Sequence, residues 1–244
     1  MSVVVFGGNG FVGQNILKAL VARGESVVSI SRSGAVPKNA QAEEWSRSVT
    51  WTQGDAMNLS TYADVLSKAK SVVVSVGSPP LPFVDESWQI KMNGESNATV
   101  INAAADAGVA QVVLINATVP AWGASGYVKG KKMAEECAEA FVKTSPEGVS
   151  RGAMVLKPGA VYGTRHTSSG FPIPLSPILA PVSWVLGMVP GVVAAATKAA
   201  PFFLEGALVP PVAVDKLATL AADGAVSPEY AGVYTSLSAF EVTK

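Results

Sequence analysis

Short apolar runs alternate with longer amphipathic segments through the first two-thirds of the chain. The apolar runs are rich in β-branched residues, as in strands buried on both faces, and are Val3–Phe6, Ser26–Ser31, Val49–Gln53, Ser71–Val76, Gln111–Ile115 and Gly152–Leu156. The segments with helical periodicity are Gly13–Arg23, Ser60–Ala69, Glu86–Ala107 and Gly126–Lys143. Strands that alternate with such helices form parallel sheets, so the pattern predicts an α/β fold with a doubly wound parallel sheet.

The pattern changes in the last third of the chain. No charged side chain occurs in residues 167–197, a stretch of 31 residues that is long enough to cross a bilayer. Five prolines interrupt it, so we predict an apolar cap of loops and short helices instead. Beyond it, Val214–Ala222 is expected to be a helix and Gly232–Ser236 a last strand. We therefore divide the chain into residues 1–165 and a smaller C-terminal cap, residues 166–244, which completes the same domain.

The first apolar run breaks into glycines. Gly7, Gly10 and Gly13 follow it in a G-x-x-G-x-x-G spacing and lead into the amphipathic segment Gln14–Ala22. A strand that ends in glycines and opens into a helix is typical of Rossmann-type dinucleotide binding, because glycines allow a tight turn and a close approach to a pyrophosphate. The residues of this turn that we expect to contact the cofactor are Gly7, Asn9, Gly10, Phe11, Val12 and Gly13.

The end of the second run bears on the choice of cofactor. A site for NAD usually places a carboxylate there for the ribose 2′-hydroxyl, whereas this chain has Ser31, Arg32 and Ser33. A guanidinium with nearby hydroxyls pairs with a 2′-phosphate, so we predict NADP(H), with NAD(H) less favoured. The alternative for Arg32 is a solvated position at a strand end. The further residues expected to bind the cofactor are Asp55, Val76 and Gly77.

One predicted helix carries a tyrosine and a lysine four residues apart. Tyr127 and Lys131 therefore share a helix face, and we expect the lysine cation to lower the pKa of the phenol, which makes it a general acid and base. The same lysine is expected to hold the nicotinamide ribose; a solvated helix face is the alternative.

Composition limits the classes of partner. The formal net charge is zero and 15% of the residues are charged, which argues against nucleic-acid binding. Cys137 is the single cysteine and His166 the single histidine, so we expect no internal disulfide and no metal site. Met1 leads almost directly into the first predicted strand, and no targeting peptide is visible.

These motifs together resemble the short-chain dehydrogenase/reductase superfamily, in its atypical or extended form. Besides the glycines and the Tyr127–Lys131 pair, the turn Lys157–Gly163 is similar to the R-P-G-x-x-Y-G turn of that superfamily. The resemblance implies that Pro158 and Gly159 contact the cofactor. It also reveals one departure, because Asn116 stands where active members usually have the serine or threonine that polarises a substrate carbonyl. The resemblance implies Asn116 or Thr118 as the candidate for that role.

A narrower resemblance rests on Phe6–Gly13 and Val27–Gly34. These runs are similar to a subgroup that contains the nucleotide-binding accessory subunit of respiratory complex I, a coenzyme Q biosynthesis oxidoreductase-like protein and a plant plastid homologue. The resemblance implies a mitochondrial location, at the matrix side of the inner membrane, with plastid or cytoplasm as alternatives. It also implies quinone-related chemistry or membrane-complex subunits as partners, with peripheral membrane contact through residues 167–204.

Two hypotheses of function follow. The first is an NADP(H)-dependent oxidoreductase that reduces a hydrophobic carbonyl or quinone-related compound, with the cap as the apolar pocket. The second is a non-catalytic accessory subunit of a membrane complex, in which bound NADPH stabilises the fold without turnover. The placement of Asn116 and Thr118 relative to Tyr127 discriminates between them.

Overall fold

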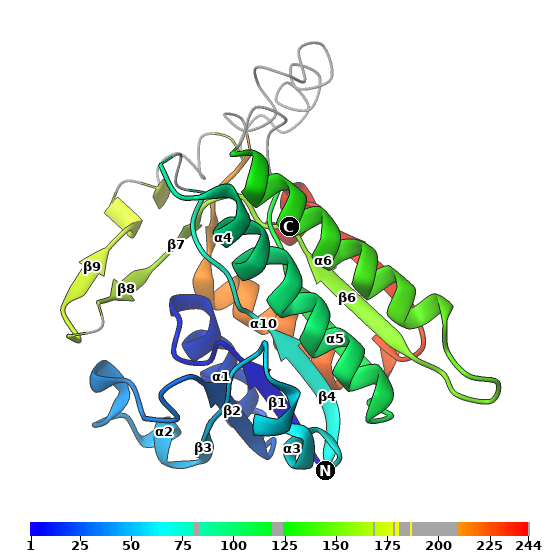
Figure 1. Cartoon of the computed structure of the whole chain (residues 1–244). Helices are drawn as coiled ribbons and strands as arrows, with labels where there is room; N and C mark the ends of the chain where they lie inside the picture. The colour runs from blue at the N-terminus through cyan, green and yellow to red at the C-terminus, as the bar shows by residue number, and fades with distance from the viewer. Residues whose placement is uncertain are drawn as a thin grey trace.

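Seven parallel strands form the central sheet of the protein (Figure 1). A computed structural model describes residues 1–80, 83–118, 124–167, 169–177, 179–180, 186 and 209–243. The strands of the central sheet are β1 (Ser2–Phe6), β2 (Val27–Ser31), β3 (Val49–Gln53), β4 (Ala69–Val74), β5 (Gln111–Ile115), β6 (Gly152–Leu156) and β11 (Tyr234–Leu237). Their order is β11-β6-β5-β4-β1-β2-β3, and every pairing is parallel. This confirms the predicted Rossmann-type α/β fold.

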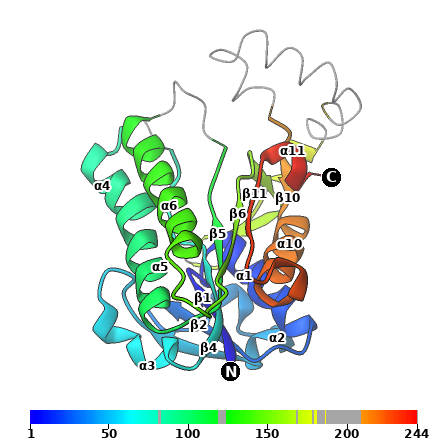
Figure 2. The ribbon, with the colours of Figure 1, turned by 90° about the vertical axis from the view of Figure 1, so that its right-hand side faces the viewer.

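Helices cover both faces of the sheet (Figure 2). The longer ones are α1 (Phe11–Ala22), α5 (Ser96–Asp106), α6 (Ser125–Lys143) and α10 (Val214–Val226). The short helices are α2 (Glu44–Arg47), α3 (Ala63–Leu66), α4 (Glu86–Ile90) and α11 (Ala239–Val242). Helices α1 and α10 pack on one face, whereas α3, α5 and α6 pack on the other.

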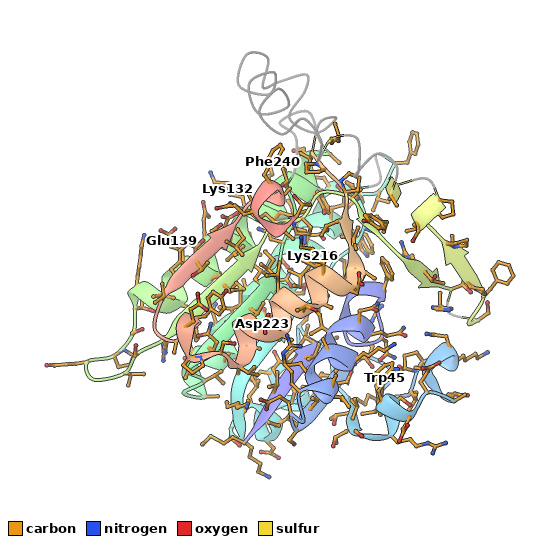
Figure 3. All side chains as sticks on the ribbon, turned by 180° about the vertical axis from the view of Figure 1, so that it is seen from behind. Trp45, Lys132, Glu139, Lys216, Asp223 and Phe240 are labelled. Atoms are coloured by element: carbon orange, nitrogen blue, oxygen red, sulfur yellow. The ribbon has the colours of Figure 1, made fainter. Side chains whose placement is uncertain are left out.

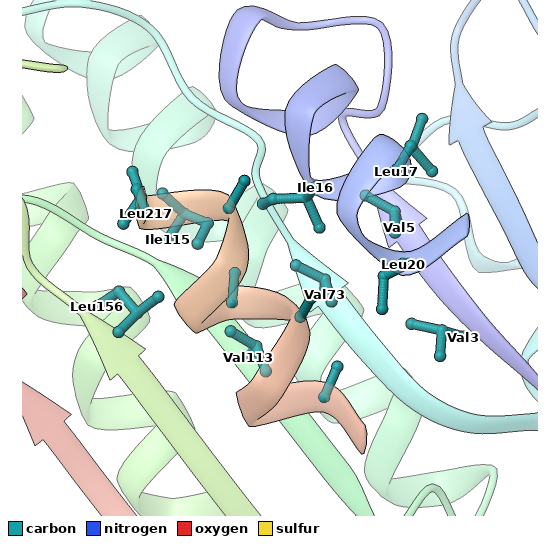
Figure 4. Packing of buried hydrophobic residues seen from close by; sticks show 14 of the residues in the cluster. Val3, Val5, Ile16, Leu17, Leu20, Val73, Val113, Ile115, Leu156 and Leu217 are labelled. Carbon is teal, nitrogen blue, oxygen red and sulfur yellow. The ribbon is translucent and has the colours of Figure 1, made fainter. Parts of the chain in front are cut away.

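Alternate residues of each strand fill two separate cores. In β1, Val3 and Val5 face the cluster with α1 and α10 that Figure 4 shows, whereas Val4 and Phe6 face the cluster with α5 and α6. Successive side chains of a strand point to opposite faces, so a strand covered on both sides is apolar at most positions. This is why the buried strands are recognisable as continuous apolar runs.

The boundaries of three predicted strands, 49–53, 111–115 and 152–156, agree with the structure. The predicted helix over Ser60–Ala69 is shorter, because a 3-10 turn, η2 (Leu59–Thr61), precedes α3. The long predicted helix over Glu86–Ala107 contains a π-helical turn, η3 (Lys91–Glu95), between α4 and α5. In this turn the backbone of Gly94 lies against α6, since a Cβ on Gly94 would be 2.9 Å from Gly130 Cα.

The C-terminal elements join the same sheet. Strand β11 pairs with β6, and α10 packs against α1. Two smaller sheets lie beside it: β10 (Val212–Ala213) pairs with β7 (Val161–Tyr162), and β8 (Thr164–His166) pairs with β9 (Pro172–Pro174). The division of the chain at residue 165 stays a prediction.

The uncharged stretch lies mostly outside the described residues, as does most of the predicted membrane contact through 167–204. Among the helices that the structure describes, none is both long and apolar enough to cross a bilayer.

Candidate functional site

A pocket of about 620 Å³ opens at the carboxyl ends of β1, β2, β3 and β4. The order of the strands reverses between β1 and β4, which is where doubly wound sheets bind ligands. The pocket brings together most of the residues predicted to bind the cofactor, and these are Gly7, Asn9, Gly10, Ser31, Arg32, Ser33, Asp55, Val76 and Gly77.

The glycine turn is shaped by steric limits. Gly7 has φ +82°, and a Cβ on it would overlap the carbonyl oxygen of Ser75. A Cβ on Gly13 would overlap the carbonyl oxygen of Gly7, so only glycine lets α1 start this close to β1. Gly10 is the N-cap of α1 and provides no side-chain cap. In an α-helix the backbone N–H groups of the first turn, here those of Phe11, Val12 and Gly13, have no hydrogen-bond acceptor within the helix.

Hydroxyl groups and a free guanidinium surround the end of β2. The Oγ atoms of Ser31 and Ser33 are 3.4 Å apart, and Asn9 Nδ2 donates to Ser33 Oγ at 3.1 Å and to the carbonyl oxygen of Ala35 at 3.0 Å. Arg32 is exposed and forms no ion pair with any residue that the structure describes. The end of β2 therefore presents donors and positive charge.

The opposite wall includes residues that sequence reasoning missed. Trp88, Lys91 and Met92 line the pocket from α4 and the π-helical turn. A π-helical turn rotates the following side chains relative to an α-helix, and periodicity in the sequence does not reveal it. Asp55 also lines the pocket, and its Oδ1 accepts from the backbone N–H of Met57 at 3.0 Å, so its carboxylate also stabilises a turn.

A small residue is required at position 77. A Cβ on Gly77 would lie 2.8 Å from Asn93 Oδ1 and 3.7 Å from Lys131 Nζ. Asn93 fixes this segment, because its Oδ1 accepts from the Ser78 backbone N–H at 3.0 Å and its Nδ2 donates to Ser78 Oγ at 2.9 Å. Lys131 Nζ therefore lies near Gly77, although Lys131 is not among the residues that line the pocket.

Tyr127 and Lys131 share one face of α6, with Lys131 Nζ 5.7 Å from the centroid of the Tyr127 ring. Both side chains are buried, and Lys131 Nζ donates to the Ile115 carbonyl oxygen at 3.4 Å. Burial raises the pKa of Tyr127 to about 12 and lowers the pKa of Lys131 to about 8. The expected lowering of the tyrosine pKa is wrong, because desolvation of the buried phenol raises its pKa.

The two candidate carbonyl polarisers are engaged within the protein. Asn116 Nδ2 donates to the Lys131 carbonyl oxygen at 3.2 Å and lies 3.3 Å from Glu135 Oε2. Thr118 Oγ1 donates to the Lys157 carbonyl oxygen at 2.7 Å. Their polar groups therefore point into the protein, and their predicted role in catalysis stays a prediction.

Glu135 organises this end of the sheet, and sequence reasoning missed it. Its Oε1 accepts from Lys157 Nζ at 2.9 Å and from Ser236 Oγ at 3.4 Å, while its Oε2 faces Asn116. Glu135 follows Lys131 by four residues on α6, and this spacing is the one feature of the sequence that places the two residues on the same helix face.

Pro158 and Gly159, which were predicted to contact the cofactor, do not line the 620 Å³ pocket. They lie near the end of β5, where the Thr118 backbone N–H donates to the Pro158 carbonyl oxygen at 2.9 Å.

Comparisons with known proteins agree with this arrangement. Residues 3–172 match the NAD dependent epimerase/dehydratase family. An uncharacterized chloroplastic protein of Arabidopsis thaliana is 35% identical over 237 residues, which are 96% of this chain and 74% of the relative. MIOREX complex component 2 of Saccharomyces cerevisiae is 40% identical over 77 residues, which are 31% of this chain and 28% of the yeast protein.

A solved structure shares the fold. It is an oxidoreductase of the short chain dehydrogenase/reductase family from Burkholderia thailandensis, with a TM-score of 0.67 and 15% sequence identity. The similarity covers 98% of this chain and 91% of the other.

Proposed function

The chain belongs to the NAD dependent epimerase/dehydratase family, and we propose that it binds NADP(H) and reduces a hydrophobic carbonyl or quinone-related compound. The observation that carries the proposal is the gathering of the glycine turn, the end of β2 and the segment after β4 around one 620 Å³ pocket. This family is of the extended short-chain dehydrogenase/reductase type. The fold supports the binding of a dinucleotide, and we assign the roles of the individual residues in that binding.

The residues present fit a dinucleotide. The narrow turn at Gly7 and Gly13 leaves no room for a Cβ, so backbone N–H groups at the start of α1 can approach a pyrophosphate. Ser31, Arg32 and Ser33 would hold a 2′-phosphate, and Lys131 would hold the ribose next to the nicotinamide. A bound nicotinamide dinucleotide supplies a hydride for reduction.

The preference for NADP(H) rests on the charge at the end of β2. That end lacks a carboxylate, and Arg32 is unpaired among the described residues. Isothermal titration should therefore give tighter binding of NADPH than of NADH. Arg32→Ala should weaken NADPH about tenfold or more and leave NADH unchanged, since a charge-assisted hydrogen bond contributes about 1.5–3 kcal/mol. Arg47→Ala, an exposed arginine on α2, is the matched control.

Tyr127 is the proposed proton donor. Its pKa of about 12 keeps it protonated at neutral pH, as a donor to a forming alkoxide must be. The assay follows loss of NADPH absorbance with a hydrophobic quinone or an aromatic aldehyde as acceptor. Tyr127→Phe should abolish the oxidation and retain NADPH binding, whereas Tyr230→Phe, in the turn that precedes β11, should change neither.

A second candidate is a non-catalytic protein that holds NADP(H) within a larger complex. It is supported by the internal hydrogen bonds of Asn116 and Thr118, and by the yeast relative whose name describes a complex component. In that case NADPH raises the melting temperature, no acceptor oxidises it, and the chain co-purifies with other subunits.

The cap and the location are part of the same proposal. Residues 166–244 would complete the domain and supply the apolar wall for the substrate or for a membrane-complex partner. The chloroplastic relative favours a plastid, and the narrower resemblance favours the mitochondrial inner membrane. Fractionation of cells that express the tagged full-length protein decides between them.

A further inference from the structure

A second cavity, of about 340 Å³, lies on the outer side of α1. Its walls come from α1, the segment 39–45, β8 and the start of α10, and it shares no lining residue with the 620 Å³ pocket. In Figure 1, α2 lies below the β8–β9 pair on the same side of the molecule, and Figure 3 shows Trp45 at that place from behind. Its volume is within the range of about 300–1,000 Å³ that is usual for small-molecule sites.

The cavity contains two opposite charges that do not pair with each other. Lys18 from α1 and Glu43 from the segment before α2 both line it as exposed residues at its rim, and neither forms an ion pair with any described residue. His166 adds ring nitrogens from β8. Asn39 uses its Nδ2 to donate to Gln14, which leaves its Oδ1 as an acceptor. The cavity therefore offers a cation, a carboxylate, and neutral groups of both kinds.

Apolar side chains form the rest of the wall. They are Phe11, Trp45 and Val214. Trp45 is held against Trp51 with ring centroids 6.4 Å apart, and Phe11 and Val214 both approach Gly163. A ring held in place by such packing offers a flat apolar surface at low entropic cost.

We propose that this cavity binds an α-amino acid with an apolar side chain. The ligand carboxylate pairs with Lys18 and His166, and its ammonium group pairs with Glu43 and Asn39. The apolar side chain packs against Trp45 and Phe11. A ligand with a single charge would leave one protein charge unpaired, so the zwitterion is the chemistry that complements both.

The cavity is connected to the end of β2 by hydrogen bonds. Asn39 Nδ2 donates to Gln14 Oε1 at 2.7 Å, and Gln14 Nε2 donates to the Asn9 carbonyl oxygen at 3.0 Å. Asn9 Nδ2 in turn donates to Ser33 Oγ at 3.1 Å. A ligand that binds Asn39 therefore acts on the group proposed to hold the 2′-phosphate. This coupling, unlike the binding itself, rests on the proposed NADP(H) function.

The test titrates L-phenylalanine into the full-length protein without nucleotide, by isothermal titration calorimetry. Phenylacetate, which lacks the ammonium group, and 2-phenylethylamine, which lacks the carboxylate, are titrated in parallel. We expect L-phenylalanine to bind at least about tenfold more tightly than either analogue, since each analogue leaves one charge unpaired. Lys18→Met and Glu43→Gln should each weaken L-phenylalanine by a similar factor. Glu44→Gln, the neighbouring exposed carboxylate outside the cavity, is the matched control.

Three results would overturn the assignment: no binding of L-phenylalanine at millimolar concentration, equal binding of phenylacetate, or full binding by Glu43→Gln. The coupling is tested by titrating NADPH with and without saturating L-phenylalanine. Because linkage is reciprocal, each ligand must change the affinity of the other by the same factor. An unchanged NADPH affinity refutes the coupling, and a protein that binds L-phenylalanine but no NADPH refutes the proposed function and leaves the amino-acid site standing.

Discussion

The glycine turn and the end of β5 are two ends of one candidate site, and they are prepared in opposite ways. At the turn, the start of α1 and the side chain of Arg32 are left without partners among the described residues, so they are available to a ligand. At the end of β5, Asn116 and Thr118 already donate to carbonyl oxygens of the protein. The proposed binding end is therefore preformed, whereas polarisation of a substrate would require hydrogen bonds to be exchanged.

The largest effect is expected from a substitution that disrupts the glycine turn. Gly13→Ala places a Cβ on the carbonyl oxygen of Gly7, so α1 must move away from β1. Overpacking of this kind costs about 1–3 kcal/mol of stability, and we expect NADPH binding to be lost. Titration calorimetry and urea denaturation measure the two effects.

Gly24→Ala is the matched control for that change. Gly24 ends the same helix with φ +74°, and no atom lies within 4 Å of its would-be Cβ. It should cost about 1 kcal/mol through backbone strain alone and leave NADPH affinity intact. If Gly13→Ala binds NADPH as well as Gly24→Ala does, the close approach of α1 and β1 is not needed for binding.

The next effect concerns Lys131, which lies between the two ends. Burial lowers its pKa from 10.5 to about 8, so the folded state holds its proton less tightly than the unfolded state does. Below about pH 8 the folded protein bears the cost of a buried charge, and stability should rise as the pH increases from 8 towards 10. The expected gain is about 2–3 kcal/mol, because one pKa unit corresponds to about 1.4 kcal/mol.

Urea denaturation at a series of pH values measures that gain. Burial also raises the pKa of Cys137 from its ordinary value of 9.0, which opposes the rise within this window, and the raised pKa of Tyr127 opposes it above pH 10. Lys131→Met should be more stable than the wild type below pH 8 and should lack the rise. Lys132→Met, an exposed neighbour, should keep it. A flat profile in the wild type would show that Lys131 is not buried as a charge.

A smaller effect is expected at the end of β5, where Glu135 pairs with Lys157. Glu135→Gln keeps the shape of the side chain but weakens its contacts with Lys157 and Asn116. The side chains of Lys157 and Glu135 are 28% and 30% exposed, so we expect the substitution to lower the free energy of unfolding by about 1 kcal/mol. Glu139→Gln, which removes an exposed pair on the same helix, should cost less than about 0.5 kcal/mol.

The same variant separates the two proposed functions. If internal pairing of Asn116 holds the site inactive, Glu135→Gln should raise the turnover number for NADPH oxidation and leave its KM for NADPH unchanged. Turnover that stays at zero, with NADPH still bound, favours the non-catalytic role.

The sequence predicts most of one end of the site and little of the other. The glycine turn is predictable because the absence of a Cβ is a local property, written in Gly7 and Gly13. The partners of Asn116 are not, because Glu135 reaches it only after α6 docks on β5. For the same reason the pKa of Tyr127 moves against expectation: the i, i+4 spacing shows the nearby cation but not the burial. The π-helical turn at Lys91–Glu95 is likewise tied to a long-range contact, because its Gly94 lies against Gly130 of α6.

The smallest effect is expected at Ser33, and it tests which groups at the end of β2 hold the 2′-phosphate. Ser33 accepts from Asn9 at 3.1 Å and is exposed, so Ser33→Ala removes one neutral hydrogen-bonding group at the proposed 2′-phosphate position. A bond of this kind contributes about 0.5–1.5 kcal/mol, which predicts NADPH binding weaker by a factor of about two to twelve. NADH lacks the 2′-phosphate, so its affinity should not change. Ser48→Ala, an exposed serine after α2, is the control. Equal losses for NADPH and NADH would mean that Ser33 acts through the glycine turn, because Asn9 would then lose its anchor, and the 2′-phosphate would have to be held by Ser31 and Arg32.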